Sequence, residues 1–217
     1  MKIAITGGIA CGKSLLSRCL NGLGVETLDA DDVVHEILPD PAERRRIAEE
    51  VFSDPGKRRE LEAKLHPLVK TRIDNWLDGT NGTNRTARTD VTNETGARLA
   101  GPGCLVSPGG PVSPVRVAII PLLFEVHWEG NFDIICAVVS SREKQIERMT
   151  TTRGMTREEA EARLAAQMPA EEKARRSHYV IRNEGSPEEL KAQAAAFLEW
   201  LQDPQFTIHN PSTWQTS

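Results

Sequence analysis

Near the start of the chain, a short apolar run gives way to glycines and then to apolar residues at helical spacing. Residues 2–6 form the apolar run, small residues fill 7–14, and leucines recur at intervals of three to four residues over 15–23. A continuous apolar run of this length is typical of a buried strand, and the later spacing is typical of an amphipathic helix. The pattern predicts a strand, a glycine loop and a helix that ends near Gly22 and Gly24.

Further short apolar runs occur at 25–29, 115–120, 132–139 and 179–181. Helical patterns separate most of them, and this alternation is typical of α/β proteins with a parallel sheet. Ser186 followed by Pro187 is a good start for a last helix that reaches about residue 201. We therefore expect a three-layer α/β fold with a parallel sheet of about five strands.

Two long charged segments carry the remaining helical patterns. In 41–77 the apolar residues recur at helical spacing and are interrupted at 54–56, which predicts a helical pair or triplet. Residues 142–149 predict one helix, and 150–176 predict further helical structure with a break at Pro169.

The composition changes abruptly between residues 78 and 114. Gly, Thr, Asn and Pro dominate this stretch, and few aliphatic residues are present. Such a segment buries too little apolar surface to fold alone, so we expect a disordered insertion. The expected organisation is one domain over 1–201, with the insertion inside it and an unassigned tail at 202–217.

The charge balance and the cysteines limit the classes of function. The chain of 217 residues has 27 basic and 31 acidic residues, and a net charge of -4 gives no general attraction to nucleic acid or anionic membrane. No apolar run is long enough to span a bilayer, so we expect a cytoplasmic protein with small-molecule partners. The four cysteines lack zinc-site spacing. Cys11 is either an easily oxidised thiol or a small residue that fits a tight loop.

The segment from Gly7 to Ser14 matches the pattern G-x-x-x-x-G-K-[ST] between the first strand and the first helix. In such a P-loop, backbone N–H groups and the helix N-terminus hold phosphates, the lysine reaches the β- and γ-phosphates, and the hydroxyl ligates magnesium. We therefore expect ATP and Mg²⁺ as cofactors, with Ser14 as the metal ligand and Lys13 as a catalytic residue. The expected nucleotide-binding residues here are Gly8, Ile9, Ala10, Cys11, Gly12, Lys13, Ser14 and Leu15.

An acidic cluster follows the second predicted strand. In a small P-loop kinase the acceptor hydroxyl lies at this edge of the sheet, and a carboxylate there can accept its proton. Asp31 is the candidate catalytic base, and capping of the next helix is the alternative role. For Asp29 and Asp32 we leave open capping or a place near the magnesium ion.

Arg148 and Arg153 flank a polar stretch between two predicted helices. Kinases of this kind carry a mobile lid there, and its closure brings guanidinium groups onto the transferring phosphoryl group. We expect a lid over about 148–176, with Arg148 as a catalytic residue and Arg153 as a nucleotide-binding residue. A solvated surface position is the alternative for each arginine.

Several blocks together resemble the dephospho-coenzyme A kinase family, in that family's order and over nearly the whole chain outside the insertion and the tail. The blocks are Thr6-Gly7-Gly8-Ile9, Asp29-Ala30-Asp31, Val51-Phe52-Ser53-Asp54, Leu61-Glu62, Leu65-His66-Pro67, Pro121-Leu122-Leu123-Phe124-Glu125, Gln145 with Arg148, Arg153-Gly154, Gln167, Val180-Ile181 and Asn183-Glu184-Gly185-Ser186.

The resemblance implies that MgATP phosphorylates the ribose 3′-hydroxyl of dephospho-coenzyme A, the last step of coenzyme A synthesis. It implies that Asp31 is the base and binds the acceptor, that helices around His66 in about 40–77 hold the acceptor, and that Asn183 contacts adenine. His66 read by itself is a helix-end histidine before a proline. Glu125 is either a carboxylate near the site or a loop charge.

Two features depart from the family pattern. The connection from Asp31 to Val51-Phe52 is shorter, and the insertion replaces a short connection. A kinase for another small acceptor and a weakly active ATP-binding regulatory protein therefore remain alternatives. A nucleic-acid-binding module is disfavoured because no basic patch with interleaved aromatic residues is present. We expect a monomer or a small homo-oligomer.

Overall fold

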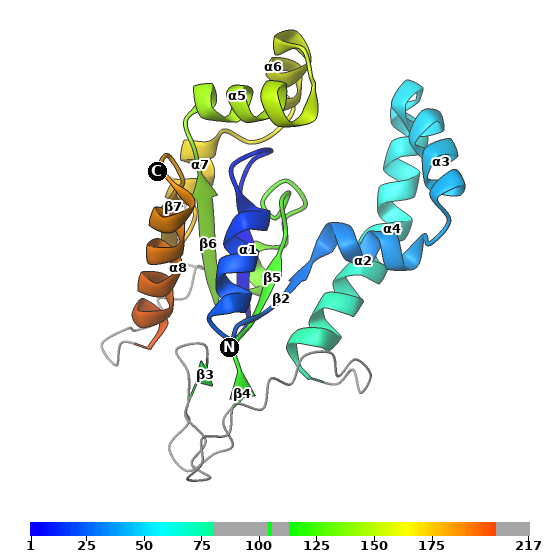
Figure 1. Ribbon diagram of the computed structural model, residues 1–217. Helices are drawn as coiled ribbons and strands as arrows, with labels where there is room; N and C mark the ends of the chain where they lie inside the picture. The colour runs from blue at the N-terminus through cyan, green and yellow to red at the C-terminus, as the bar shows by residue number, and fades with distance from the viewer. Residues whose placement is uncertain (80–103, 106–112, 203–217) are drawn as a thin grey trace, which may run out of the picture. The chain divides into compact units, whose positions relative to one another are not determined.

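The computed structural model describes residues 1–79, 104–105 and 113–202 (Figure 1). Most of the insertion and all but the first residue of the tail lie outside these ranges, so the disorder of the insertion stays a prediction. The chain divides into two compact units, Met1–Thr27 with Thr89–Ser217 and Leu28–Arg88, which are considered separately below. In the described ranges, no helix combines the length and the apolar character that a membrane span requires.

A five-stranded sheet in the order β2-β5-β1-β6-β7 organises the first unit. Its strands are β1 (Ile3–Thr6), β2 (Glu26–Asp29), β5 (Arg116–Ile119), β6 (Ile134–Val139) and β7 (Tyr179–Arg182). The pairs β1–β5, β1–β6 and β6–β7 are parallel, with Ile5 between Ile119 and Cys136. The central position of β1 brings the segment that follows it to the middle of the carboxyl edge, where open α/β sheets bind ligands.

Helices cover both faces of this sheet, as the three-layer prediction requires. Helix α1 (Lys13–Gly22) and helix α8 (Pro187–Leu201) lie side by side on one face, and α7 (Ala170–Arg175) packs on the other (Figure 1). The alternation along β6 fits this arrangement, because Cys136 and Val138 join the core with α1 and α8, whereas Val139 packs with Ala174 of α7.

The predicted helix ends are confirmed where local signals are strong. Helix α1 ends at Gly22, and Gly24 follows with a φ of 87°. Helix α8 begins after Ser186, whose hydroxyl accepts a hydrogen bond from the Glu189 N–H, and Pro187 occupies the first turn.

The predicted boundary between two helices after residue 149 is wrong. Helix α5 (Arg142–Arg153) continues to Gly154, whose φ of 64° ends it, so Arg148 and Arg153 lie on one helix. The threonines at 150 and 151 are helical, and their hydroxyls donate to carbonyls one turn earlier. Helix α6 (Arg157–Ala165) then begins with a capping box at Thr156.

The remaining elements of the first unit are short. A 3₁₀ helix, Glu129–Asn131, precedes β6. Strands β3 (Cys104–Leu105) and β4 (Ser113–Pro114) form an antiparallel pair within the predicted insertion.

The described residues of the second unit form three helices. They are α2 (Ala30–Ile37), α3 (Pro41–Ser53) and α4 (Pro55–Leu77), and both α2 and α3 pack against α4. The helical pair predicted for 41–77 is thus confirmed, with its break at Asp54, which caps α4 through bonds from the N–H groups of Gly56 and Lys57.

The reading of His66 as a helix-end residue is wrong, because Pro67 lies inside α4. Helix α4 continues past the proline, since Val69 and Ile73, which follow Pro67 in the chain, are buried. The Pro67 carbonyl accepts a hydrogen bond from the Thr71 hydroxyl. Tertiary packing therefore outweighs the helix-breaking tendency of this proline.

An aromatic cluster holds α8 to the edge of the sheet that carries β7. The ring centroids of Tyr179 and Phe197 lie 5.0 Å apart, and those of Phe197 and Trp200 lie 6.1 Å apart. Phe197 is completely buried in the main core. Large rings in such a position contribute both buried area and ring contacts.

We expect the substitution Phe197→Ala to lower the free energy of unfolding by about 3 to 5 kcal/mol, because it leaves a cavity between α8 and β7. Urea denaturation measures this loss. The control Lys191→Ala, an exposed position on the same helix, is expected to change the stability by less than about 0.5 kcal/mol. Equal effects of the two substitutions would contradict this account of the core.

Candidate active site

The P-loop predicted between β1 and α1 is present, and two of its glycines are required by close contacts. Gly7 has a φ of 152°, and a Cβ there would lie 2.3 Å from the Val138 carbonyl oxygen. Gly12 has a φ of 102°, and a Cβ there would lie 2.0 Å from Nδ2 of Asn183. Any side chain at either position would therefore displace the loop.

Side chains hold the backbone carbonyls of the loop from Gly7 to Cys11. Lys13 Nζ donates to the oxygens of Gly7 and Gly8, both at 2.8 Å. Gln145 Nε2 donates to the Ile9 oxygen at 2.6 Å, and Arg148 Nη1 donates to the Ala10 oxygen at 3.2 Å. Asn183 Nδ2 donates to the Cys11 oxygen at 2.9 Å, and the Ser140 hydroxyl lies 3.3 Å from the same oxygen.

The peptide N–H groups point away from the carbonyls, because a trans peptide places the two on opposite sides. Within the described residues, the N–H groups of Ala10, Gly12, Lys13 and Ser14 donate to no protein acceptor. Unpaired amides that converge at the start of a helix form an anion-binding site. The loop is thus ready to bind phosphate.

Ala10 has a φ of 56°, which is rare for a residue with a side chain. The left-handed conformation costs an alanine about 1–2 kcal/mol. Packing and hydrogen bonds compensate for this strain, because Ile9 and Ala10 lie against the cluster formed by Ile146, Met149 and Ala160. Helices α5 and α6 therefore support the outer part of the loop.

Lys13 and Ser14 occupy the positions that the motif assigns to them. Lys13 is half-buried, and its ammonium group contacts only neutral loop carbonyls and, at 3.8 Å, the Cys11 sulfur. Ser14 is exposed in the first turn of α1. Among the described residues, no group of three His, Cys, Asp or Glu side chains could hold a metal ion. The residues present fit a magnesium ion that takes most of its ligands from phosphate and water, with Ser14 as the protein ligand.

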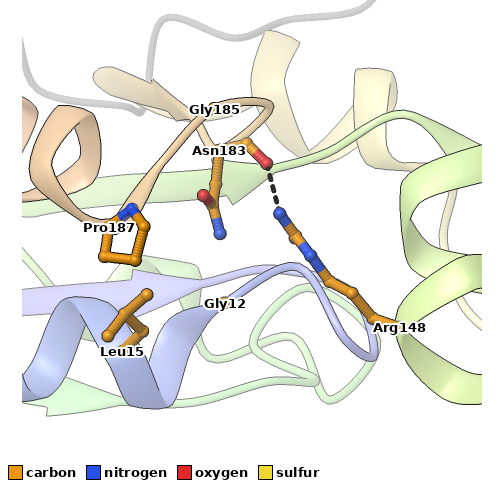
Figure 2. A pocket seen from close by; sticks show the side chains of 6 residues that line it. All are labelled: Gly12, Leu15, Arg148, Asn183, Gly185 and Pro187. Atoms are coloured by element: carbon orange, nitrogen blue, oxygen red, sulfur yellow. Dashed lines mark hydrogen bonds between the residues drawn. The ribbon is translucent and has the colours of Figure 1, made fainter. Parts of the chain in front are cut away.

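A pocket of about 330 Å³ opens beside the loop, as Figure 2 shows. Leu15 and Pro187 supply apolar surface on one side, and Asn183 and Arg148 lie on the other (Figure 2). Gly12 and Gly185 complete the lining. Apolar side chains together with backbone polar groups suit a ligand that carries a ring system.

Arg148 connects the loop to the ends of two strands. Its Nη1 donates to the Ser140 hydroxyl at 2.9 Å as well as to Ala10, and its Nη2 donates to the Asn183 carbonyl at 2.9 Å (Figure 2). Arg153 instead lies exposed in the last turn of α5, with no hydrogen bond or ion pair in the described part of the chain. The structure brings Arg148 to the loop and leaves Arg153 apart from it.

Asn183 is almost completely buried, and its amide is already occupied by the Cys11 carbonyl. Its backbone N–H donates to Val139, and its carbonyl accepts from Ser140 and Arg148. The side chain therefore braces the loop, while the backbone around it lines the pocket. Cys11 is also buried, with its sulfur 2.8 Å from where a Cβ of Gly7 would lie, which favours its role as a small residue in a tight loop.

Lys173 belongs to the site, although the sequence did not reveal it. Its side chain is fully buried, and its Nζ donates to the Pro121 carbonyl at 2.8 Å and to Glu125 at 2.7 Å. Burial lowers the pKa of Lys173, and the Glu125 carboxylate opposes this shift. Glu125 also accepts a bond from the Met168 N–H at 3.0 Å, which shows that it is more than a solvated loop charge. A lysine in a charged helix gives no sequence signal of burial, and its partner lies far away in the chain.

The predicted acceptor residues lie in the second unit. Asp29 caps α2, because its Oδ1 accepts a hydrogen bond from the Asp31 N–H at 2.9 Å. Asp31 and Asp32 are exposed in the first turn of the same helix, and His66 is half-buried within α4. The capping role therefore belongs to Asp29.

Comparisons with known proteins agree with this geometry. The family model described as dephospho-CoA kinase matches residues 1–43 and 111–189, more than half of the chain. A dephospho-CoA kinase of Synechococcus sp. (strain JA-3-3Ab) is 37% identical, over 90% of each sequence. One of Geobacter sulfurreducens is 34% identical, over 87% of this chain and 92% of the relative. Residues 44–110, which include most of the predicted insertion, lie between the two matched segments.

Solved structures with the same fold include kinases. TT1252 from Thermus thermophilus superposes with a TM-score of 0.67 at 30% identity and covers 94% of this chain and 98% of its own. The shikimate kinase from Acinetobacter baumannii, with a TM-score of 0.53, 13% identity and 95% of both chains covered, shows likeness of fold alone. With its P-loop and these relatives, the chain belongs to the dephospho-CoA kinase family and is an enzyme that uses ATP to phosphorylate dephospho-CoA.

Proposed function

We propose that the P-loop of the first unit binds MgATP and that Asp31 activates the ribose 3′-hydroxyl of dephospho-CoA. The hydroxyl oxygen attacks the γ-phosphorus, its proton passes to the Asp31 carboxylate, and ADP leaves. The products are coenzyme A and ADP. The observation that carries the proposal is the set of unpaired N–H groups at Ala10, Gly12, Lys13 and Ser14, in a loop whose carbonyls are held by side chains.

The phosphates of ATP occupy this amide site in our proposal. The Lys13 ammonium group exchanges its neutral carbonyl partners for the β- and γ-phosphates, because a charged acceptor forms a stronger hydrogen bond. The Ser14 hydroxyl would hold the magnesium ion, which would supply positive charge against the phosphates. The adenine ring enters the pocket beside Leu15 and Pro187, where the backbone near Asn183 supplies polar contacts.

The choice of Asp31 as the base rests on its local bonding. Asp29 uses a carboxylate oxygen to cap α2, whereas the Asp31 carboxylate is exposed and has no partner in the described part of the chain. A free carboxylate can accept the proton of the acceptor hydroxyl. We propose that His66 contacts the acceptor.

The two arginines have different proposed roles. Arg148 maintains the loop, because three oxygen acceptors already engage its guanidinium group. Arg153, which is exposed, contacts the nucleotide when the part of the predicted lid around it closes, whereas Arg148 and the buried Lys173 keep both ends of the 148–176 segment in place. We further propose that the protein acts in the cytoplasm on soluble substrates, as a monomer or a small homo-oligomer.

The substitution Lys13→Ala is expected to lower kcat by about 10²- to 10³-fold, because it removes a donor to the transferring phosphoryl group. ADP release from MgATP, measured with and without dephospho-CoA, gives the rate, and mass spectrometry identifies the product. Lys191→Ala serves as the control and is expected to retain full activity. A wild-type protein that releases no ADP with dephospho-CoA would refute the proposed reaction.

The substitution Asp31→Asn is expected to lower kcat by about 10²- to 10⁴-fold while the affinity for ADP changes less than twofold, because a positioned base acts on the transfer step. Asp32→Asn removes the same charge from the same exposed turn and is the matched control, expected to retain activity within about threefold. Calorimetric titration with ADP separates binding from turnover. Similar losses in the two variants would show that Asp31 has no special role.

A further inference from the structure

Two glutamines hold the peptide groups on both sides of Ile9. Gln145 of α5 donates from Nε2 to the Ile9 carbonyl at 2.6 Å, and its side chain is almost completely buried. Gln167, which follows α6, accepts a bond from the Ile9 N–H through Oε1 at 2.9 Å. A Cβ on Gly8 would lie 2.9 Å from Nε2 of Gln145, so this glycine permits the close approach.

The two bonds fix the backbone on either side of Ile9, directly before the strained residue Ala10. The Ile9 carbonyl and the Ala10 N–H belong to the same peptide plane and point in opposite directions. A bond from Gln145 to the carbonyl therefore determines where the Ala10 N–H points. Because Ala10 has a left-handed φ, the loop keeps this orientation only while its surroundings enforce it.

Gln167 is itself attached firmly to the sheet. The next residue, Met168, donates its N–H to Glu125, and Glu125 pairs with the buried Lys173. Lys173 and the hydroxyl of Thr6, at the end of β1, both donate to the Pro121 carbonyl. The connection between α6 and α7 is thus linked to the strand that leads into the P-loop.

The P-loop mechanism leads us to expect the loop segment near Ile9 to face the terminal phosphoryl group of bound ATP. Lys13 serves the β- and γ-phosphates in a P-loop, and its ammonium group lies against the carbonyls of Gly7 and Gly8, next to Ile9. The amides of Gly12, Lys13 and Ser14 lie at the start of α1, where the helix N-terminus favours the inner phosphates. A shift at Ile9 should therefore affect phosphoryl transfer more than ADP binding.

We propose that Gln145 and Gln167 are positioning residues that together fix Ile9 and thereby aim the Ala10 N–H at the transferring phosphoryl group. Neither glutamine contacts the substrate in this proposal. Each acts through the backbone. Both are needed because Gln167 holds the peptide group before Ile9 and Gln145 holds the one after it, and together these two groups fix φ and ψ of Ile9. The inference rests on the proposed function, since it concerns the same transfer step.

The test uses Gln145→Met, Gln167→Met and the double variant, because methionine keeps the length of the side chain and removes both hydrogen-bonding groups. Each single variant is expected to lose about 10- to 100-fold in kcat, since misplacement of about 1 Å can cost that much. The affinity for ADP should change less than threefold. The double variant should lose no more than about threefold beyond the worse single variant, because the two residues act on one backbone segment.

Gln193→Met is the matched control. Gln193 accepts a bond from the Arg182 N–H at 3.1 Å and donates to the Arg182 carbonyl at 2.9 Å, so it makes the same pair of contacts away from Ile9. Its variant should keep kcat within about twofold. Urea denaturation of all variants checks that the loss of activity does not follow a loss of stability.

Amide hydrogen exchange by NMR gives a readout that requires no turnover. The Ile9 amide should exchange at least about tenfold faster in Gln167→Met and remain unchanged in Gln193→Met, because only the former removes its acceptor. If the wild-type protein failed to phosphorylate dephospho-CoA, the proposed function would fall, while the exchange rates would still decide on the glutamine contacts. Unchanged kcat, parallel losses of kcat and ADP affinity, multiplicative losses in the double variant or an unchanged Ile9 exchange rate would each overturn the inference.

Discussion

The site depends on the hydrogen bonding of the P-loop carbonyls by side chains from outside the loop. Donors come from α5, from the end of β6 and from the segment after β7, and they are joined by Lys13 from the loop itself. A backbone loop of small residues has many conformations, and ordering it costs about 1–2 kcal/mol per residue. The surrounding fold provides the bonds that offset this cost before ATP arrives, so the nucleotide meets a site whose amides are already aligned.

The same constraint makes distant parts of the sequence depend on one another. Asn183 follows the last strand, yet its amide nitrogen lies where a Cβ of Gly12 would be. Gln145 stands in the same relation to Gly8. Each of these two glycines lacks a side chain, and this leaves room for the Asn or Gln side chain that donates a hydrogen bond to the loop backbone.

Much of this arrangement could be predicted from local signals, and the remainder depends on contacts between distant residues. The apolar runs predicted the strands, and the motif after β1 predicted the phosphate loop, because both signals are continuous in the chain. The roles of Gln145, Gln167 and Lys173 could not be predicted, since their partners lie more than 40 residues away. Pro67 misled the reading of α4 because packing, which no local pattern records, outweighed the proline.

The place where the chain enters strand β5 determines how the enzyme tolerates added residues. Val115 is buried beside β2, where its carbonyl accepts the Glu26 N–H at 2.9 Å, and the chain then runs along β5 toward the carboxyl edge of the sheet. In a parallel sheet, residues that precede a strand join it at the amino edge, opposite the edge that carries the P-loop. Residues added before Val115 therefore connect to the sheet at the edge opposite the P-loop. We therefore expect that a stretch of different length, or a reporter tag inserted there, leaves the catalytic edge and nucleotide binding intact.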